Sequence, residues 1–293
     1  MRLGVVIPQM RPWKELARDF AWAEDVGYDV AYVYDHLTHP TAAGGWLADG
    51  FSILAAAATS TSRVGLGTLV ASATLHSPVA LARLAATTDD IADGRLVLGL
   101  GAGSPRCSNA DRGEAPTPGE MHRRLADVVE GLVAVFEGAT HWQGATRSFG
   151  GLETTATPSG AGTPYLMLAA HGPKGMDLTV RHADAWNTNG GPGSVELAHE
   201  AYWDAVRIQG ERFTEACERV GRDPDQPRRT LLLGYGTIRP TTSSAAYDDA
   251  IGRAHEEGFD ELIVYGPFGE SGGRFWSDPE VHGDVVARHR ATA

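Results

Sequence analysis

The chain has 293 residues with 25 Lys and Arg against 37 Asp and Glu, a net charge of −12 that argues against nucleic acid or an anionic membrane as its main partner. Hydrophobic residues make up 42% of it, enough for a sizeable core, but no run of about 18 apolar residues predicts a membrane span, and the apolar N-terminal segment is too short for a signal peptide. Its two cysteines are too few for a disulfide framework, so a soluble cytoplasmic enzyme is the expected class.

Eight short apolar segments rich in Val, Leu and Ile predict β-strands. Most of them do not alternate polar and apolar residues, which is typical of parallel strands that are buried on both faces. The predicted strands are residues 3–7, 30–34, 64–70, 96–100, 165–169, 183–188, 230–238 and 262–265.

Helical patterns lie between these strands. In the first of them, three apolar residues have the spacing of one helix face: Leu16, Phe20 and Ala23. A longer apolar stripe of the same kind runs through residues 125–136. Ser77 followed by Pro78 predicts a helix start, with the serine as N-cap and the proline in the first turn.

Eight strands that are each followed by a helix predict an α/β fold, a (β/α)8 TIM barrel with insertions, as a single domain over residues 1–293. Gly27 and Gly258 stand before the second and the eighth strand, where a left-handed glycine would end the preceding helix. The alternation of strand and helix therefore rests on local signals as well as on hydrophobicity.

Two segments exceed the minimal barrel. Residues 138–163 are predicted to hold a small hairpin and an irregular connection, and residues 266–274 form a Gly-rich loop after the eighth strand. Long loops on a barrel often serve as lids or oligomer contacts. We expect four side chains to line the barrel mouth, with the covering of apolar barrel surface as the alternative for the aromatic ones: Trp46, Asp49, Trp142 and Phe268.

The ends of the predicted strands are where chemistry is expected, because TIM-barrel active sites lie at the C-terminal ends of the strands. His36, with Asp35 beside it, is the best candidate for proton transfer, since a neutral imidazole can accept or donate a proton near pH 7. Neighbouring residues on an extended chain point opposite ways, so the two need not pair. The alternative is a hydrogen-bonded loop histidine with Asp35 capping a turn.

Two Gly-rich segments follow later strands. The segment over residues 99–103 lacks the last glycine of a dinucleotide fingerprint, and it indicates either close backbone approach to a ligand or barrel packing that needs small residues. Gly172 to Gly175 predict a helix start whose free N–H groups favour an anion, with an ordinary helix start as the alternative. Cys107 lies near the expected site but is more often incidental in such a position.

Other catalytic classes find little support in the sequence. His36 and His39 are three residues apart on a predicted loop, without a HExxH motif or a cysteine pair, so no metal site is predicted. A GxSxG nucleophile elbow is also absent, which argues against a serine hydrolase.

Taken together, these motifs resemble the luciferase-like monooxygenase family over nearly the whole chain. The order of a third strand, a helix that starts with proline and a fourth strand after Gly-Arg-Leu is specific to it. The stretches that carry the resemblance are residues 62–70, 76–82, 92–103, 118–125 and 183–187. The family fold is a (β/α)8 barrel with insertions, in agreement with the prediction from the pattern.

The residues Tyr34-Asp35-His36-Leu37 resemble the branch of this family that uses the deazaflavin coenzyme F420. The resemblance implies that Asp35 and His36 face the deazaflavin ring and act in catalysis, with His36 as proton donor or acceptor. It also implies a bulge behind the ring, often with a non-proline cis peptide bond. That bulge would be formed by Leu69, Val70 and Ala71.

The resemblance further implies where the cofactor tail would bind. The residues concerned are Ala102, Gly103 and Ser104 after the fourth strand, and His171, Gly172, Pro173, Lys174 and Gly175 after the fifth. The chain departs from the family at both places: Ser104-Pro105-Arg106 replaces a bulky aromatic residue and a later Glu, and Ala170-His171 replaces paired glycines. Both departures lie where the contacts to the cofactor tail are expected, so they bear on the phosphate contacts and on the choice of cofactor.

The function implied by this resemblance is that of an F420-dependent oxidoreductase, which transfers a hydride between C5 of the deazaflavin and an unidentified small organic substrate. One alternative is an FMN-dependent monooxygenase. Another is a barrel that binds a flavin or deazaflavin without turnover. The resemblance also implies a homodimer.

Overall fold

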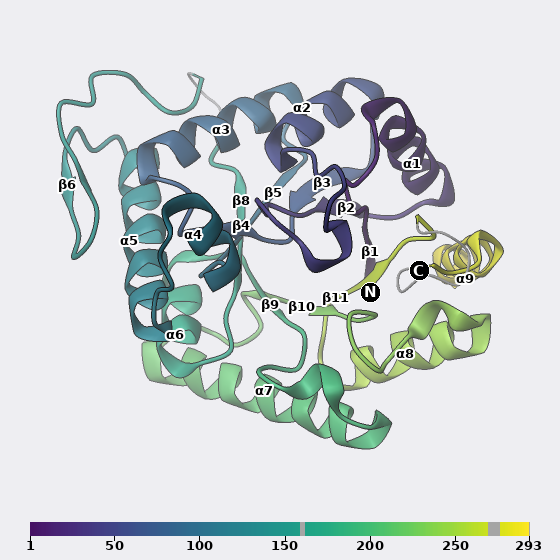
Figure 1. Ribbon diagram of the computed structural model, residues 1–293. Helices are drawn as coiled ribbons and strands as arrows, with labels where there is room; N and C mark the ends of the chain where they lie inside the picture. Colours follow the sequence, from purple (N-terminus) through teal and green to yellow (C-terminus); the bar gives the residue numbers. More distant parts are fainter. Residues whose placement is uncertain (159–161, 269–275, 293) are drawn as a thin grey trace.

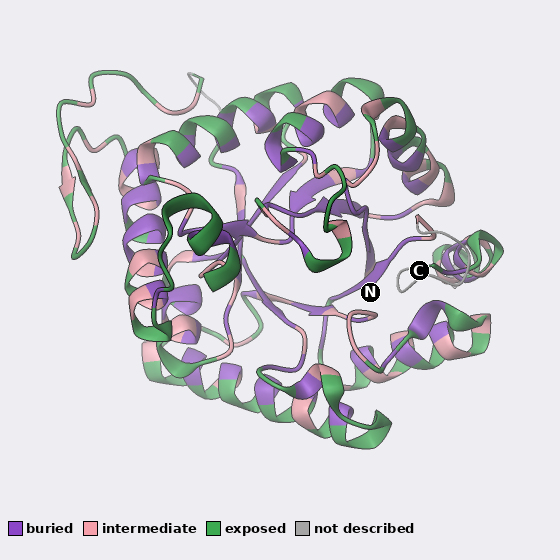
Figure 2. Ribbon diagram, in the orientation of Figure 1, coloured by how far each residue is buried: buried purple, intermediate pink, exposed green. Residues whose placement is uncertain are grey.

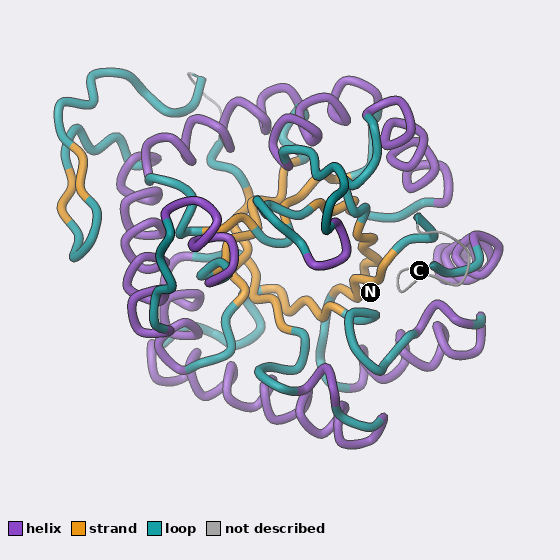
Figure 3. Tube along the Cα trace, in the orientation of Figure 1, coloured by secondary structure: helices purple, strands orange, loops and turns teal. Residues whose placement is uncertain are grey.

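A closed ring of parallel strands forms the centre of this computed structural model, which describes residues 1–158, 162–268 and 276–292 (Figures 1 and 3). The short strands β3 and β4 together occupy one strand position of the ring. The ring closes there, because both of them pair with β5. The predicted (β/α)8 barrel is therefore confirmed. Its strands are β1 (Arg2–Val6), β2 (Val30–Val33), β3 (Gly65–Thr68), β4 (Ala71–Ser72), β5 (Leu96–Gly101), β8 (Tyr165–Ala169), β9 (Ala185–Thr188), β10 (Arg228–Leu232) and β11 (Glu261–Tyr265).

Helices surround this ring, and Figure 1 shows them in chain order around it. They are α1 (Trp13–Val26), α2 (Gly50–Ser60), α3 (Pro78–Ile91), α5 (Pro118–Phe136), α6 (Pro173–His182), α7 (His199–Val220), α8 (Ser244–Glu256) and α9 (Pro279–Thr292). The short α4 (Pro105–Arg112) lies inside the ring of helices in this view, in front of the strands. Three single 3-10 turns are η1 (Pro40–Ala42), η2 (Ser194–Glu196) and η3 (Pro240–Thr242).

The helix boundaries follow the local signals in the sequence. The Ser77 hydroxyl accepts a hydrogen bond from the Ala80 N–H at 3.4 Å, and Pro78 opens α3 as predicted. Gly27 (φ 100°) and Gly258 (φ 78°) both adopt the left-handed conformation where α1 and α8 end, so both predicted glycine caps are confirmed.

Two apolar layers hold the barrel together, one between strands and helices and one inside the ring (Figure 2). Alternate strand residues serve the two layers, because successive side chains on a strand point to opposite faces. Inside the ring, Tyr32 is fully buried, and its ring fits because β3 carries a glycine opposite to it: a Cβ on Gly67 would lie 2.6 Å from Tyr32 Cε1.

The predicted third and seventh strands differ in extent from the observed ones. The segment 64–70 is interrupted by a cis peptide bond between Leu69 and Val70, which separates β3 from β4 at the place that the family resemblance implied. The segment 230–238 ends as a strand at Leu232, because Gly234 turns the chain with φ of 93°. Hydrophobicity alone does not reveal either interruption.

The insertion over residues 138–163 contains the predicted hairpin, formed by β6 (Trp142–Gln143) and β7 (Ser148–Phe149). The hairpin lies outside α5, at the left edge of Figure 1. Trp142 stacks on Phe149 and packs against Gly131 of α5, so the expectation that it lines the barrel mouth is wrong.

Of the other expected mouth residues, Phe268 also lies elsewhere, while Asp49 and Trp46 lie in the loop between β2 and α2. Phe268 packs edge-on against Trp22 of α1, with ring centroids 5.3 Å apart, and belongs to the layer between strands and helices, so its expected place at the mouth is wrong. Asp49 caps α2 by accepting a hydrogen bond from Ser52 N–H at 2.7 Å, and Trp46 is exposed. Most of the loop 266–274 lies outside the described residues.

Candidate functional site

The end of β2 is held in place by a buried amide. Gln9, which follows β1 and is fully buried, donates from Nε2 to the Tyr34 carbonyl at 2.6 Å and accepts from the Tyr34 N–H at 3.1 Å. These two bonds continue the pairing of β1 with β2 beyond the last ladder residues. Asp35 and His36, which come next in the chain, therefore leave the barrel from a fixed position.

Asp35 connects β2 to the segment after the cis peptide bond. Its buried Oδ2 accepts hydrogen bonds from the Ser72 N–H at 2.9 Å and from His76 Nε2 at 2.7 Å. Its Oδ1 accepts no hydrogen bond from the part of the chain that the structure describes. The carboxylate thus fixes the start of the loop after β4 and keeps one oxygen for other partners.

His36 points to a different neighbour. Its Nδ1 lies 3.4 Å from the Sγ of Cys107, a buried residue of α4. The Tyr34 and His39 rings lie near the imidazole, each with its centroid 5.5 Å from that of His36. His36 Nε2 makes no hydrogen bond to any described residue, so this nitrogen is the one that remains for a ligand.

The Cys107 thiol is acidified by this arrangement. Burial raises its pKa, but the hydrogen bond with His36 and the backbone of Thr38 and Leu37 lower it, so the net pKa is about 7. The thiol also lies 3.7 Å from the Thr38 carbonyl oxygen. A proton can therefore be shared between a sulfur and an imidazole at this end of the barrel.

The Gly-rich segment over residues 99–103, at the end of β5, is explained by packing within the barrel. A Cβ on Gly99 would lie 2.0 Å from the Thr68 carbonyl oxygen, and one on Gly103 would lie 2.1 Å from Ser72 Oγ. Ala102 is half-buried beside them, and Ser104 caps α4 by accepting from the Arg106 N–H at 3.2 Å. The packing explanation therefore accounts for the glycines, while the half-buried backbone of this loop remains at the same rim as Asp35.

The segment after β8 forms a helix start, as predicted. Gly172 is the N-cap of α6 and Pro173 its first residue, and a Cβ on Gly172 would meet no atom within 4 Å. Lys174 is exposed in this first turn. His171 lies 3.3 Å from Thr188 Oγ1, and burial lowers the pKa of its imidazole, which favours the neutral form. The open backbone and the helix dipole suit an anion here.

The predicted site residues share one end of the barrel but do not form a single cluster. Asp35 and His36 diverge, as expected for neighbours on an extended chain, and each contacts a residue that the sequence did not identify as catalytic or cofactor-binding. Those residues are His76 and Cys107, which lie 41 and 71 positions away from their partners. The available signals were the place of His76 beyond the third predicted strand and that of Cys107 after the fourth.

The polar groups at this rim fit an organic cofactor with an anionic tail. Asp35 Oδ1, an acceptor, and His36 Nε2 are left free at the strand ends, and α6 offers backbone N–H donors with open space around Gly172. The cis bond between Leu69 and Val70, followed by buried Ala71, lies between these two groups of polar atoms along the sheet. Within the described ranges, no group of three or more His, Cys, Asp or Glu side chains is arranged to hold a metal ion.

Known proteins were compared with the chain. A family profile described as luciferase-like monooxygenase matches residues 1–274. A protein of Mycobacterium tuberculosis whose name assigns it to the coenzyme F420-dependent oxidoreductases is 31% identical over 199 residues, 64% of this chain and 54% of that protein. An F420-dependent glucose-6-phosphate dehydrogenase of Beutenbergia cavernae is 32% identical over 224 residues, 70% of this chain and 63% of its own. The match thus spans less than two thirds of the length of these two relatives.

Solved structures have the same fold at low sequence identity. An F420-dependent secondary alcohol dehydrogenase in complex with an F420-acetone adduct has a TM-score of 0.80 at 17% identity, over 98% of this chain and 97% of its own. The oxygenating constituent of 3,6-diketocamphane monooxygenase from Pseudomonas putida, in complex with FMN, has a TM-score of 0.74 at 16% identity, over 98% of both chains. Separately, none of the described helices is long and apolar enough to cross a membrane.

Proposed function

The chain belongs to the luciferase-like monooxygenase family, and from this membership we propose that it is an F420-dependent oxidoreductase acting on a small organic substrate. The observation that carries the proposal is the pair Asp35 and His36 at the end of β2, with one free carboxylate oxygen and one free imidazole nitrogen at the strand end. The two relatives described above whose names include F420 support the same cofactor.

When bound, the deazaflavin would supply the hydride carrier of the reaction at its C5 atom. The protein's part is orientation and proton transfer. His36 would give or take a proton at Nε2, because its Nδ1 is engaged by Cys107 Sγ at 3.4 Å. The Cys107 thiol thereby selects which imidazole nitrogen faces the ligand.

Asp35 would act from the same side of the ring. Its Oδ1 is directed to the ligand, while Oδ2 is occupied by Ser72 and His76. These two bonds keep the carboxylate from rotating, so its charge stays at a fixed distance from the segment formed by Leu69, Val70 and Ala71. This proposal assigns that segment to the back of the ring.

The cofactor tail is proposed to bind at two neighbouring places on the rim. The first turn of α6, with Gly172, Lys174 and Gly175, would bind phosphate through backbone N–H groups and the lysine charge. The loop of Ala102 and Gly103 would line the path between the ring and this turn. We also propose that the protein forms a homodimer, as the family resemblance implies. Its two cysteines imply the cytoplasm as its location.

A side-by-side titration of the purified protein with F420 and FMN, followed by fluorescence, tests this function. We expect saturable binding of F420 with clearly higher affinity than FMN. Tight binding of FMN without measurable binding of F420 would overturn the proposal in favour of an FMN-dependent monooxygenase. Binding of F420 without turnover across a broad panel of alcohols, aldehydes and ketones would instead indicate a binding protein.

A further inference from the structure

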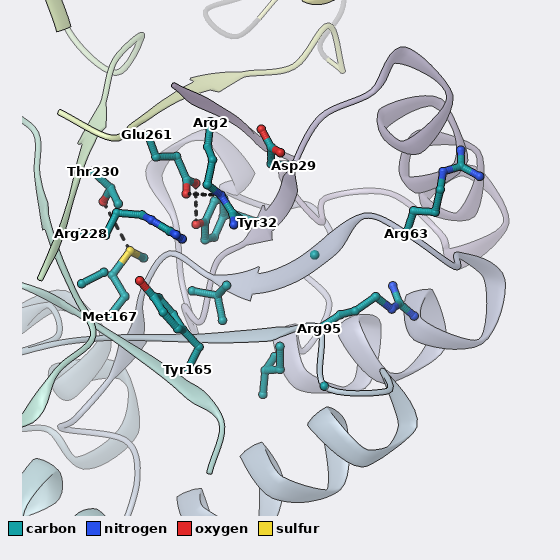
Figure 4. A pocket seen from close by; sticks show the side chains of 15 residues that line it. Arg2, Asp29, Tyr32, Arg63, Arg95, Tyr165, Met167, Arg228, Thr230 and Glu261 are labelled. Carbon is teal, nitrogen blue, oxygen red and sulfur yellow. Dashed lines mark hydrogen bonds and ion pairs between the residues drawn. The ribbon is translucent and has the colours of Figure 1, made fainter. Parts of the chain in front are cut away.

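A pocket of about 360 Å³ opens at the other end of the barrel, away from His36 (Figure 4). The strands of the ring run parallel, so their first residues gather at this end. Seven of the residues that line the pocket begin a strand: Arg2, Gly65, Leu96, Tyr165, Ala185, Arg228 and Glu261. The pocket is therefore the N-terminal mouth of the barrel, and its volume is within the range of small-molecule sites.

The charge of this pocket is opposite to that of the chain. Four arginines line it against two carboxylates, Asp29 and Glu261, whereas the whole chain carries a net charge of −12. An acidic protein thus concentrates positive charge at one concave place, where low-dielectric walls strengthen its field.

Both carboxylates of the pocket are already matched. Buried Glu261 accepts a hydrogen bond from the Tyr32 hydroxyl at 2.8 Å and is paired with Arg2 Nε at 3.3 Å. Asp29 is paired with Arg290 at 2.7 Å and accepts a hydrogen bond from the Leu3 N–H at 2.7 Å. Their negative charges therefore offset Arg2 and Arg290, and Glu24 pairs with Arg63, which leaves Arg95 and Arg228 without a carboxylate partner among the described residues.

Arg228 is the arginine that these contacts leave available. Its guanidinium stacks over the Tyr165 ring at 5.6 Å from the centroid, and no carboxylate of the described residues lies within 4.0 Å of it. Figure 4 shows Arg228, Arg2 and Tyr165 directed toward the same space, next to Glu261. The aromatic ring orients the guanidinium without neutralising it, so its planar fork can bind an anion.

Two further guanidiniums lie across the pocket from Arg228. Arg95 donates to the carbonyl oxygens of Ala58, Thr61 and Val64, which fix its position but leave its charge unbalanced. Arg63 is exposed and forms a long ion pair with Glu24, at 4.0 Å. In Figure 4 Arg63 and Arg95 occupy the side opposite to Arg228, with their guanidiniums directed away from it.

We propose that this N-terminal mouth is a second binding site, and that it takes a small hydrophilic anion with more than one charge, of the phosphate or polycarboxylate class. One charged group binds the guanidinium of Arg228, and the rest of the anion extends into the pocket beside Arg2, which is directed toward the same space. The arginines that line the pocket favour a hydrophilic ligand. The site does not depend on the cofactor at the opposite end of the barrel.

Isothermal titration of the full chain with pyrophosphate, and separately with citrate, tests the site at an ionic strength of about 0.15 M, where weak surface attraction is screened. We expect saturable binding of at least one of the two anions, and the comparison distinguishes phosphate from carboxylate recognition. Arg228→Gln should weaken the binding about 10- to 100-fold, since it removes a charge-assisted hydrogen bond. Arg207→Gln is the matched control, because Arg207 lies exposed on α7 between Asp204 and Glu211.

A second variant separates this site from the opposite rim. Gly172→Val alters the first turn of α6 and should leave pyrophosphate binding at the N-terminal mouth unchanged. Absence of saturable binding of both anions overturns the proposal. Binding that is lost in Gly172→Val but kept in Arg228→Gln also overturns it, and then places the anion at α6. Thermal unfolding of each variant shows that the fold is intact.

Discussion

The two ends of the barrel carry different kinds of charge, although the same eight strand positions form both. At the C-terminal end the polar groups include His36, His76, Cys107 and one carboxylate, which contact one another in pairs. At the N-terminal end four guanidiniums, which stay charged at every physiological pH, lie with two carboxylates, and burial raises the pKa of one of these, Glu261. Strand direction therefore gathers imidazole and thiol groups at one end and arginines at the other, and we expect anions to act at the N-terminal end.

The largest effect is expected from His36→Ala at the C-terminal end. General acid–base catalysis typically contributes about 10²- to 10⁴-fold, so kcat should fall by that factor with a changed pH profile. F420 affinity should change little, because the cofactor tail has its own contacts. The measurement is steady-state kinetics across pH with a substrate found in the turnover screen.

His36→Asn is the matched variant for this prediction, since asparagine keeps hydrogen bonding but cannot titrate. If His36 transfers a proton, His36→Asn should be as slow as His36→Ala. Full activity in His36→Asn with the parental pH dependence contradicts the proton role, and a loss of cofactor affinity alone would indicate that His36 only packs against the ring.

At the N-terminal end, the largest effect is expected on stability. Glu261→Ala removes the acceptor of the buried Tyr32 hydroxyl and the partner of Arg2, and should lower the free energy of unfolding by about 1–3 kcal/mol. F420 binding should be unchanged. Chemical denaturation measures the loss, and Glu200→Ala serves as control, because the ion pair of Glu200 with Arg253 is solvent-exposed and should contribute little to stability. A folded Glu261→Ala variant that no longer binds F420 would contradict the expectation that cofactor binding is independent of the N-terminal end.

The pH dependence of Cys107 sharpens the comparison at the C-terminal end. With a pKa of about 7, its thiolate should form as pH rises through 7, whereas burial raises the pKa of Cys217. The lowered value also means that the stability contributed by the Cys107 thiolate is present at pH 9 and is lost as pH falls through 7.

Ultraviolet absorbance of thiolate during a pH titration measures this behaviour. A transition near pH 7 should be present in the parent and in Cys217→Ser but absent from Cys107→Ser. A transition that survives in Cys107→Ser assigns the acidic thiol to the other cysteine and removes the contact with His36 as its cause.

The sequence predicted the strands and caps well where short-range signals determine them. β8 has the predicted bounds, 165–169. Ser77 begins a helix and Gly27 ends one, as expected, because caps depend on neighbours in the chain. The seventh strand was predicted too long, since the turn at Gly234 depends on a backbone angle that hydrophobicity does not encode.

The site was predicted only in part, because its contacts join distant segments. Asp35 and His36 were found from their place at a strand end, whereas the partners His76 and Cys107 become neighbours only when the barrel closes. The arginines of the N-terminal mouth are likewise far apart in the sequence and become neighbours only when the barrel closes. Each stands near a strand start, and nothing local marks it as part of a pocket.

The most direct test of the account is a crossed titration in which Gly172→Val and Arg228→Gln are each titrated with F420 and with pyrophosphate. Gly172 borders open space, so the valine should be tolerated by the fold, and Gly252→Val on the outer face of α8 controls for the substitution itself. We predict that Gly172→Val weakens F420 and spares pyrophosphate, while Arg228→Gln weakens pyrophosphate and spares F420. Unchanged F420 affinity in folded Gly172→Val, or weakened F420 binding in Arg228→Gln, would contradict the assignment of the cofactor to the C-terminal end.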